Sequence, residues 1–299
     1  MSILYRPPFE AGSLLLEVTE GCSHNKCTFC TMYRDQHFRV LSDEELDEQI
    51  RQMAPAADRF ERVFLENGDA FALSASRLEA IAGKIHKNFP TVRTIAMYAS
   101  INNIKAKTDR ELKSLRRLGI DQLNVGIESG YDPALELMNK GYTAAQALTQ
   151  LRRLKAAGME YAANIIFGSA GRSHLEENAQ ATAELLSAAV PYLIFTGTVH
   201  AEPGCPLYED IKGGRFDECS MGDYLDEEEV FLSELRAPGS FLFGMHPSNI
   251  FQTYGYLMKD QKRMLAGLAR RRDQLRREGR LEKIAVRGQE GAVLQDLSL

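Results

Sequence analysis

The chain has 299 residues, of which 44% are hydrophobic and 26% charged, and its formal net charge at pH 7 is -5. This composition is typical of a globular protein, and the charge gives no general attraction to nucleic acids or anionic membranes. The first residues show no basic segment followed by an apolar run, and no stretch reaches the roughly 18–20 apolar residues of a membrane span. We therefore expect a cytoplasmic protein without a membrane anchor.

Short apolar segments alternate with helical patterns over the first two thirds of the chain. They are rich in Val, Ile and Phe, as expected of buried parallel strands, and recur at roughly 30-residue intervals, the size of a βα unit. They lie at 14–18, 62–66, 92–98, 122–127, 161–167 and 192–199. The pattern predicts an α/β fold, and it fits both a six-stranded partial barrel and an open doubly wound sheet.

Helix boundaries are marked by capping residues. Capping boxes are predicted for the pairs Ser42 and Glu45, Thr108 and Glu111, and Ser173 and Glu176, and left-handed C-caps for Gly119 and Gly158. In either architecture, ligands bind at the carboxyl ends of the strands. Residues that directly follow a strand are therefore the first candidates for a functional site.

The pattern changes after about residue 205. Residues 202–216 form a connection rich in Pro and Gly, 237–252 an apolar loop or short strand, and 257–283 one long helix. We predict a domain of residues 1–215 and a small, mostly helical C-terminal extension of residues 216–299 that covers it. The tail after about residue 287 is expected to be disordered.

The segment GCSHNKCTFC at 21–30 holds three of the five cysteines, spaced Cys22-x4-Cys27-x2-Cys30, directly after the first predicted strand. Structural zinc usually takes four ligands in two pairs, and no second pair is present here. A zinc site would need His24 as its fourth ligand. Three thiolates suit a 4Fe–4S cluster that leaves one iron open. A small molecule with an amine and a carboxylate can chelate such an iron.

This segment resembles the signature of the radical S-adenosylmethionine (SAM) superfamily, Cys-x3-Cys-x-aromatic-Cys. It shares the placement, the closing spacing and the aromatic Phe29, and differs by one residue in the first gap. The resemblance covers roughly residues 10–215 and implies a partial (β/α)6 TIM-like barrel of parallel strands. The implied cofactors are a 4Fe–4S cluster and SAM, and the implied electron donor is of flavodoxin or ferredoxin type.

The resemblance also implies a mechanism. The reduced cluster would cleave SAM to a 5′-deoxyadenosyl radical, which would take a hydrogen atom from an unidentified substrate. The implied cluster ligands are Cys22, Cys27 and Cys30, and the implied SAM contacts are Phe29, Asn67, Gly68, Asp69, Ser100, Glu128, Ser129, Ile166 and Gly168. The segment 198–216 resembles the branch of methylthiotransferases, Elongator-type and coproporphyrinogen-oxidase-like enzymes.

No catalytic residue is assigned beyond the cofactor site. The candidates are His200, Cys205 and His246, and the loop at 244–249, with Ser248 and Asn249, is a candidate lid. Further candidates are Tyr33 and Arg39. Cys205 and Cys219 could ligate a second cluster or donate a hydrogen atom, but an inert buried thiol is expected for both.

Three alternatives remain open. A basic helix at 259–280 could contact RNA phosphates, so the enzyme could modify tRNA, although no RNA-binding module is evident. Tetrapyrrole chemistry ranks lower, because Thr31 and Met32 stand where such enzymes carry a further cysteine. The alternative from another class is a non-catalytic zinc or iron–sulfur scaffold. Cobalamin use has no support.

Overall fold

The computed structural model describes residues 6–284, which divide into two compact units. The first unit comprises the chain up to Asn25, Met32–Gly126 and Thr149–Ala162. The second comprises Lys26–Thr31, Ile127–Leu148 and the chain from Ala163 onward. The cysteine segment thus contributes residues to both units.

The strands form a sheet in the order β1-β4-β5-β6-β7-β8-β9-β10. Parallel pairing joins β1 to β4, β4 to β5, β5 to β6 and β8 to β9, and β10 pairs antiparallel with β9. The strands are β1 (Leu14–Glu17), β4 (Arg62–Glu66), β5 (Thr94–Ala99), β6 (Ile120–Glu128), β7 (Glu160–Phe167), β8 (Leu193–Thr198), β9 (Phe241–Gly244) and β10 (Thr253–Tyr256). The predicted α/β class and its six strands are confirmed, and the sheet continues with two further strands.

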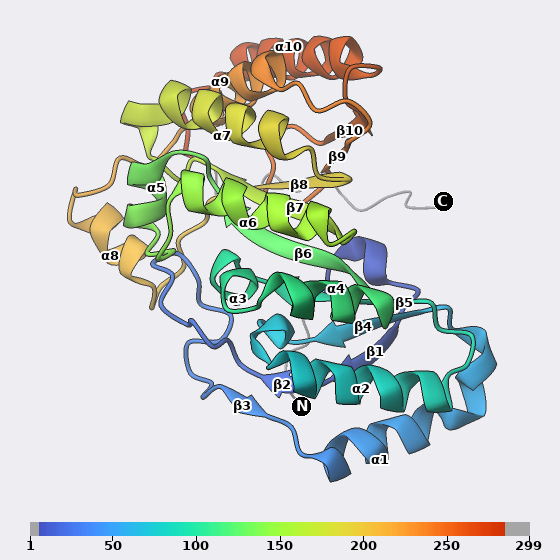
Figure 1. Cartoon of the computed structure of the whole chain (residues 1–299). Helices are drawn as coiled ribbons and strands as arrows, with labels where there is room; N and C mark the ends of the chain where they lie inside the picture. The colour runs from blue at the N-terminus through green and yellow to red at the C-terminus, as the bar shows by residue number, and fades with distance from the viewer. Residues whose placement is uncertain (1–5, 285–299) are drawn as a thin grey trace. The chain divides into compact units, whose positions relative to one another are not determined.

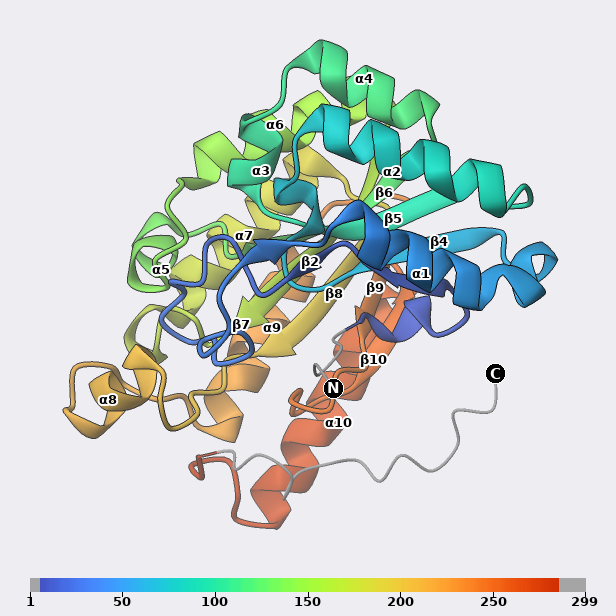
Figure 2. The ribbon, with the colours of Figure 1, turned by 90° about the horizontal axis from the view of Figure 1, so that it is seen from below.

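In the first unit, α2 (Ala75–Asn88) and α4 (Asp109–Arg117) pack side by side (Figures 1 and 2). Buried Leu and Ile side chains recur at helical spacing along α2, so one face of this helix is apolar. The unit also contains η1 (Pro8–Glu10), β2 (Thr19–Glu20), β3 (Arg39–Val40), α1 (Asp43–Met53), η2 (Ala54–Arg59), η3 (Ala70–Ala72) and α3 (Ile101–Lys105).

In the second unit, α9 (Met221–Glu234) packs against both α7 (Leu175–Ala189) and α10 (Gln261–Arg277), as Figure 1 shows. The apolar residues of α9 include Leu225 and Phe231, which are fully buried. The unit also contains α5 (Asp132–Leu137), η4 (Arg172–His174) and α8 (Pro206–Lys212), and α6 (Ala144–Ala156) runs through residues of both units.

The helix caps agree with the sequence except at one position. Ser42 and Thr108 form complete capping boxes, and Gly119 and Gly158 have left-handed φ angles of 76° and 77°. The predicted box at Ser173 is wrong, because α7 begins two residues later with His174 at an N-cap that has no side-chain hydrogen bond. The Ser173 hydroxyl instead donates to Asp217, 3.3 Å away.

The C-terminal third contains more regular structure than predicted. Residues 202–216 include helix α8, residues 237–252 include strand β9, and the long helix α10 is shorter than the predicted 257–283. The tail after residue 287 lies outside the described residues, and the domain boundary at 215 stays a prediction. No helix among residues 6–284 is long and apolar enough to cross a membrane.

Candidate active site

The three cysteines of the signature segment lie on a loop without helix or strand. None of Cys22, Cys27 and Cys30 forms a disulfide, and all three are partly exposed. Within residues 6–284, no three side chains of ligand type are yet gathered in a metal-binding arrangement. Three thiols within nine residues of irregular backbone nevertheless fit iron–sulfur ligation chemically, because such a loop can bring its sulfurs together around a cluster.

The part of the loop that belongs to the second unit is held by hydrogen bonds of the Thr28 side chain and backbone. The Thr28 hydroxyl donates to the carbonyl of Leu137 over 2.9 Å, and the Leu207 amide donates to the carbonyl of Thr28 over 3.0 Å. These bonds connect the residue between Cys27 and Cys30 to the ends of α5 and α8.

Phe29 contacts an apolar cluster in the second unit. The buried members of this cluster are Cys205, Leu207 and Phe216, and Phe29 packs against them while remaining partly buried. The Cys205 side chain is only 1% exposed. Cys219 is also fully buried, and burial raises the pKa of its thiol, which keeps it protonated. Both thiols are packed as apolar side chains.

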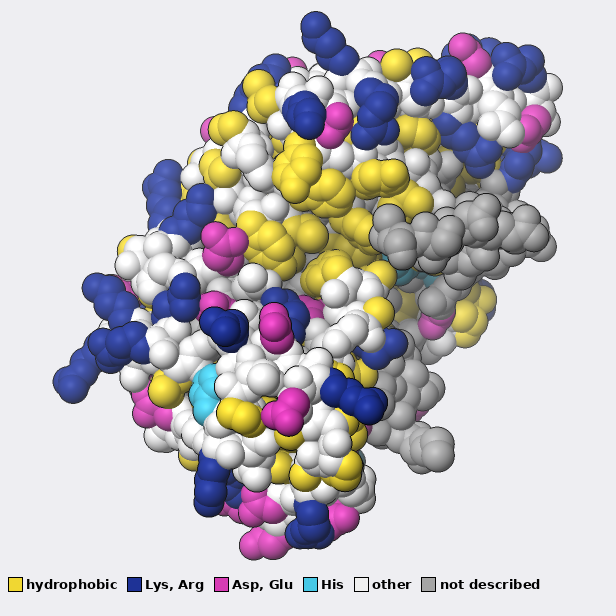
Figure 3. Space-filling view, turned by 90° about the vertical axis from the view of Figure 1, so that its right-hand side faces the viewer, with side chains coloured by type: hydrophobic (Ala, Val, Ile, Leu, Met, Phe, Trp, Pro, Cys, Tyr) yellow, Lys and Arg dark blue, Asp and Glu magenta, His cyan; other side chains and the backbone are white. Residues whose placement is uncertain are grey.

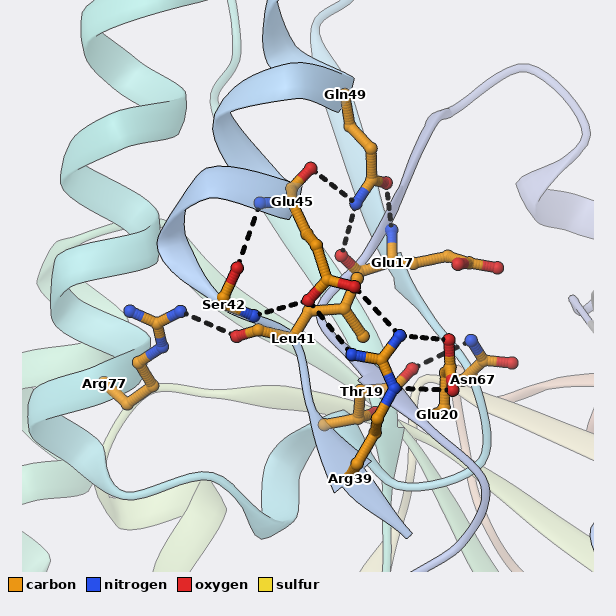
Figure 4. Close-up of polar contacts among 10 residues, drawn as sticks. All are labelled: Glu17, Thr19, Glu20, Arg39, Leu41, Ser42, Glu45, Gln49, Asn67 and Arg77. Carbon is orange, nitrogen blue, oxygen red and sulfur yellow. Dashed lines mark hydrogen bonds and ion pairs between the residues drawn. The ribbon is translucent and has the colours of Figure 1, made fainter. Parts of the chain in front are cut away.

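The segment after β4 is buried in the first unit. Asn67 has a left-handed φ of 73°, and its amide donates to the carbonyl of Thr19 over 2.8 Å (Figure 4). A Cβ atom on Gly68 would lie 2.4 Å from the Tyr33 ring, so only glycine fits there without a shift. The predicted residue Tyr33 therefore covers the backbone of the predicted residue Gly68.

Asp69 completes this segment. Its side chain is 2% exposed and accepts a hydrogen bond from the Ser23 hydroxyl, next to Cys22. Burial raises the pKa of the Asp69 carboxyl, and the hydrogen bonds from Ser23 partly oppose this. The carboxylate of Asp69 is thereby connected to the start of the cysteine segment.

Ser100 follows β5 and serves as a helix cap. Its hydroxyl accepts from the Asn103 amide over 3.2 Å, and the Asn103 side chain accepts from the Ser100 amide over 2.8 Å. This reciprocal box begins α3 at the carboxyl end of the strand.

Glu128 ends β6 and pairs with a lysine that the sequence analysis missed. The Lys140 ammonium lies 2.9 Å from Glu128 Oε1, and the two side chains are about nine-tenths buried. Burial alone would lower the pKa of Lys140, but the Glu128 carboxylate reverses this effect and the pKa is raised. Burial raises the pKa of Cys27, and the charge of Lys140 opposes this rise and so favours the thiolate. The sequence signal for Lys140 is only a lysine between two helices.

A buried network connects the ends of β6 and β7. The Ser129 hydroxyl donates to Asn178 over 2.5 Å, the Asn178 amide donates to Glu227 Oε1 over 2.6 Å, and the Gly168 amide donates to Glu227 Oε2 over 2.6 Å. Burial raises the pKa of Glu227 to about 8. We call Ser129, Gly168, Asn178 and Glu227 the buried network.

Glu227 and Asn178 were missed in the sequence. Glu227 stands in the acidic run 226–229, which looks like an exposed helix face, yet it is 1% exposed. Gly168 has a φ of 78°, and a Cβ atom there would lie 2.5 Å from the Tyr224 ring. Ile166, another predicted contact, lies near the end of β7 and is partly exposed.

The candidate catalytic histidines lie after β8 and β9. His200 is partly exposed, and His246 is within 2.7 Å of the Ser248 hydroxyl. That hydroxyl accepts from the Thr198 amide over 3.0 Å, and the Asn249 amide donates to the carbonyls of residues 196 and 244 over 2.9 Å. The loop 244–249 is thus attached to the end of β8.

Arg39 lies on the surface of the first unit. Figure 4 shows its guanidinium between the carboxylates of Glu20 and Glu45, which approach it to 2.6 and 2.9 Å. Its contacts are those of an exposed ion-pair group.

A mostly parallel α/β sheet whose first strand leads into a three-thiol loop defines a class of iron–sulfur α/β enzymes. The model of the Radical SAM superfamily matches residues 16–186. The chain belongs to the radical SAM superfamily and is a radical SAM enzyme, a family that implies a 4Fe–4S cluster and SAM. This outcome sets aside the non-catalytic scaffold.

Similar curated proteins include two from bacteria. The tRNA-2-methylthio-N(6)-dimethylallyladenosine synthase of Colwellia psychrerythraea is 28% identical over 70% of this chain and 45% of its own length. The heme chaperone HemW of Bacillus subtilis is 21% identical over 73% of this chain and 56% of its own. The chain thus spans about half the length of these relatives.

Solved structures share the fold at low identity. Coproporphyrinogen III oxidase (HemN) from Escherichia coli has a TM-score of 0.56 at 16% identity, covering 74% of this chain and 52% of its own. Elp3 from Methanocaldococcus infernus has a TM-score of 0.52 at 12% identity, covering 90% and 64%. The predicted branch of relatives is confirmed.

Proposed function

We propose that this enzyme holds its cluster through Cys22, Cys27 and Cys30 and uses SAM to abstract a hydrogen atom from a small or macromolecular substrate. The observation that carries the proposal is the three-thiol loop inside the superfamily match at 16–186. The bound cluster supplies the electron that splits SAM into methionine and a 5′-deoxyadenosyl radical.

The segment after β4 is the peptide edge that we propose for SAM. Tyr33 occupies the space beside the Gly68 Cα, so the peptide groups of Asn67 and Gly68 are the proposed hydrogen-bonding edge, and Asp69 offers a carboxylate to an ammonium group. The hydrogen bond from Ser23 orients that carboxylate. The Ser100 hydroxyl caps α3 and thereby supports the end of β5. We assign Ser100 only a secondary contact with SAM.

Further contacts are proposed at the cysteine loop and after β6 and β7. Lys140 favours the Cys27 thiolate that a cluster ligand needs. The buried network fixes the backbone after β6 and β7, where Gly168 and Ser129 border the proposed adenosine site. Phe29 and Ile166 offer apolar surface to the adenine ring and exclude water.

The proposed reaction requires a low-potential electron donor of flavodoxin or ferredoxin type. Cysteines that form no disulfide and a low-potential cluster both suit the reducing cytoplasm, and such a cluster predicts sensitivity to oxygen. We infer this compartment from the chemistry.

The test is anaerobic turnover. The protein is reconstituted with iron and sulfide, reduced with dithionite and supplied with SAM, and 5′-deoxyadenosine and methionine are quantified. We expect both products, their loss in Cys27→Ala, and their retention in the control Cys219→Ala. One tightly bound zinc, no retained iron and no product would overturn the proposal.

A tRNA-modifying activity is the second candidate. The relative from Colwellia psychrerythraea is named for tRNA modification, and α10 carries exposed basic residues along the top of Figure 3. Binding of bulk tRNA with an affinity that falls steeply with salt would support it, whereas equal retention of a neutral polymer would not. Tetrapyrrole chemistry remains third, because Thr31 and Met32 follow Cys30.

A further inference from the structure

A row of polar side chains crosses four neighbouring strands of the first unit. The register pairs Glu17 on β1 with Glu66 on β4, and Tyr98 on β5 with Asn124 on β6. The pairing of Leu65 with Met97 places Glu66 beside Tyr98. Side chains at paired positions of parallel strands point to the same face of the sheet. We call Glu17, Glu66, Tyr98 and Asn124 the polar row.

The polar row has buried acceptors that lack donors. Glu66 and Asn124 are each 1% exposed. Among the described residues, Glu66 Oε1 and Asn124 Oδ1 have no hydrogen-bond partner. Buried polar atoms are nearly always hydrogen-bonded, so two such acceptors in one row call for a donor from outside the described residues.

The charges of the row also favour a ligand that donates hydrogen bonds. Burial, and then the negative charge of Glu17, raise the pKa of the Glu66 carboxyl to about 7, and Arg6 opposes this rise. Figure 4 shows the Glu17 carboxylate pointing away from α1, while Gln49 bonds the backbone of Glu17 and the carbonyl of Glu45. The row is therefore acidic as well as rich in acceptors.

Arg62, a cationic residue on the same strand as Glu66, already has hydrogen-bond partners. Arg62, four residues before Glu66 on the same strand, forms two bonds of 2.5 and 2.8 Å to the fully buried Glu10 carboxylate. It also donates to Gln122 over 2.7 Å. These bonds orient the Arg62 guanidinium toward its own layer of the sheet.

We propose that the polar row binds the ammonium group of an amine substrate of this enzyme. A primary ammonium brings one positive charge and three N–H donors, which match the carboxylate acceptors of the adjacent residues Glu17 and Glu66. A magnesium or calcium ion would need about six or more oxygen ligands and fits the row less well. The inference rests on the proposed function, because it names the substrate class of that reaction.

The test is isothermal calorimetry on the reconstituted protein under anaerobic conditions, with pentylamine as the probe and 1-pentanol as its neutral counterpart. We expect pentylamine to bind at least about tenfold more tightly than pentanol, since one charge-assisted contact contributes roughly that factor. Glu66→Gln should weaken pentylamine binding by about tenfold. The control Glu44→Gln removes an exposed carboxylate from the same unit and should not.

A proton count separates binding from a structural effect. At pH 6 the Glu66 carboxyl, faced by Glu17, Tyr98 and Arg6, is mostly protonated, so ammonium binding should release a proton. Titrations in two buffers of different ionisation enthalpy measure this release, which should vanish in Glu66→Gln. Circular dichroism confirms that each variant is folded.

Equal affinity for pentylamine and pentanol, or unchanged binding in Glu66→Gln, would overturn the inference. Displacement of pentylamine by magnesium at equal concentration would also overturn it in favour of a metal site. Calorimetry does not depend on SAM cleavage, so the two proposals fail separately. Amine binding without 5′-deoxyadenosine would reject the proposed reaction, and 5′-deoxyadenosine without amine binding would reject the amine substrate.

Discussion

The polar row of the first unit and the buried network of the second differ in how their carboxylates are hydrogen-bonded. Burial raises the pKa of both acids, that of Glu66 to about 7 and that of Glu227 to about 8. Glu227 accepts hydrogen bonds from Asn178 and Gly168, whereas Glu66 Oε1 accepts none from the described residues. A buried acid with donors supports the backbone, and a buried acid without them is suited to bind a ligand.

The largest effect should come from breaking the buried network at its centre. Asn178→Leu leaves Ser129 and Glu227 without their partner in a site where water cannot replace it. We expect a loss of about 2–4 kcal/mol in the free energy of unfolding, measured by urea denaturation. Gln180→Leu, on the exposed side of the same helix, is the control. Equal losses in the two variants would contradict a special role for the network.

A smaller effect is expected from filling the glycine contacts of the two units. In Gly168→Ala the new Cβ meets the Tyr224 ring in a left-handed conformation, so we expect a loss of about 2–3 kcal/mol. Gly68→Ala meets only the Tyr33 ring and should cost about 1–2 kcal/mol. Tyr33→Leu should relieve most of the Gly68→Ala cost in a double-mutant cycle. An additive cycle would show that the ring contact is not the cause.

The pH dependence of stability should distinguish the buried acid Glu66 from the exposed acid Glu44. The pKa of Glu66 rises on folding from 4.5 to about 7, so its contribution to stability is fully present below pH 4.5 and is lost between pH 4.5 and 7. Glu66→Gln should remove about 1–2 kcal/mol of this loss, a value reduced for solvent screening. Urea denaturation at pH 4.5 and pH 8 measures it, with Glu44→Gln as the control. An unchanged pH profile would contradict the raised pKa.

The sequence predicts the sheet and the thiol loop well, because both depend on local patterns. Apolar runs such as 62–66 predict strands, and Cys22, Cys27 and Cys30 are identified as predicted ligands by their place after the first strand, the closing spacing and Phe29. At β9 the sequence predicts either a loop or a strand, because the short apolar run carries no periodic signal that separates the two.

The supporting residues could not be predicted, because their orientation depends on tertiary packing. Glu227 lies in an acidic helical run whose inward side is set only by the contacts of α9 with α7. Asn178 is a polar residue on the apolar face of α7, and Lys140 lies on a short loop. The polar row could not be predicted, because only the strand register places Glu66 beside Tyr98.

The smallest effect should come from the exposed ion pairs of Arg39, where water competes for every contact. Hydrogen bonds from Arg39, and then from the Ser42 amide, lower the pKa of Glu45 to about 2, so their contribution is present above pH 4.5 and lost as the pH falls through 2. Arg39→Gln should change the Tm at pH 7 less than any test variant above, the controls excepted, and added salt should reduce the difference further. Thermal unfolding followed by circular dichroism measures this, with Arg51→Gln, another exposed ion-pair arginine, as the control. Because Glu45 has its donors and is also exposed, a large loss in Arg39→Gln would mean that hydrogen bonding alone, without burial, decides which acids of this enzyme contribute to its stability.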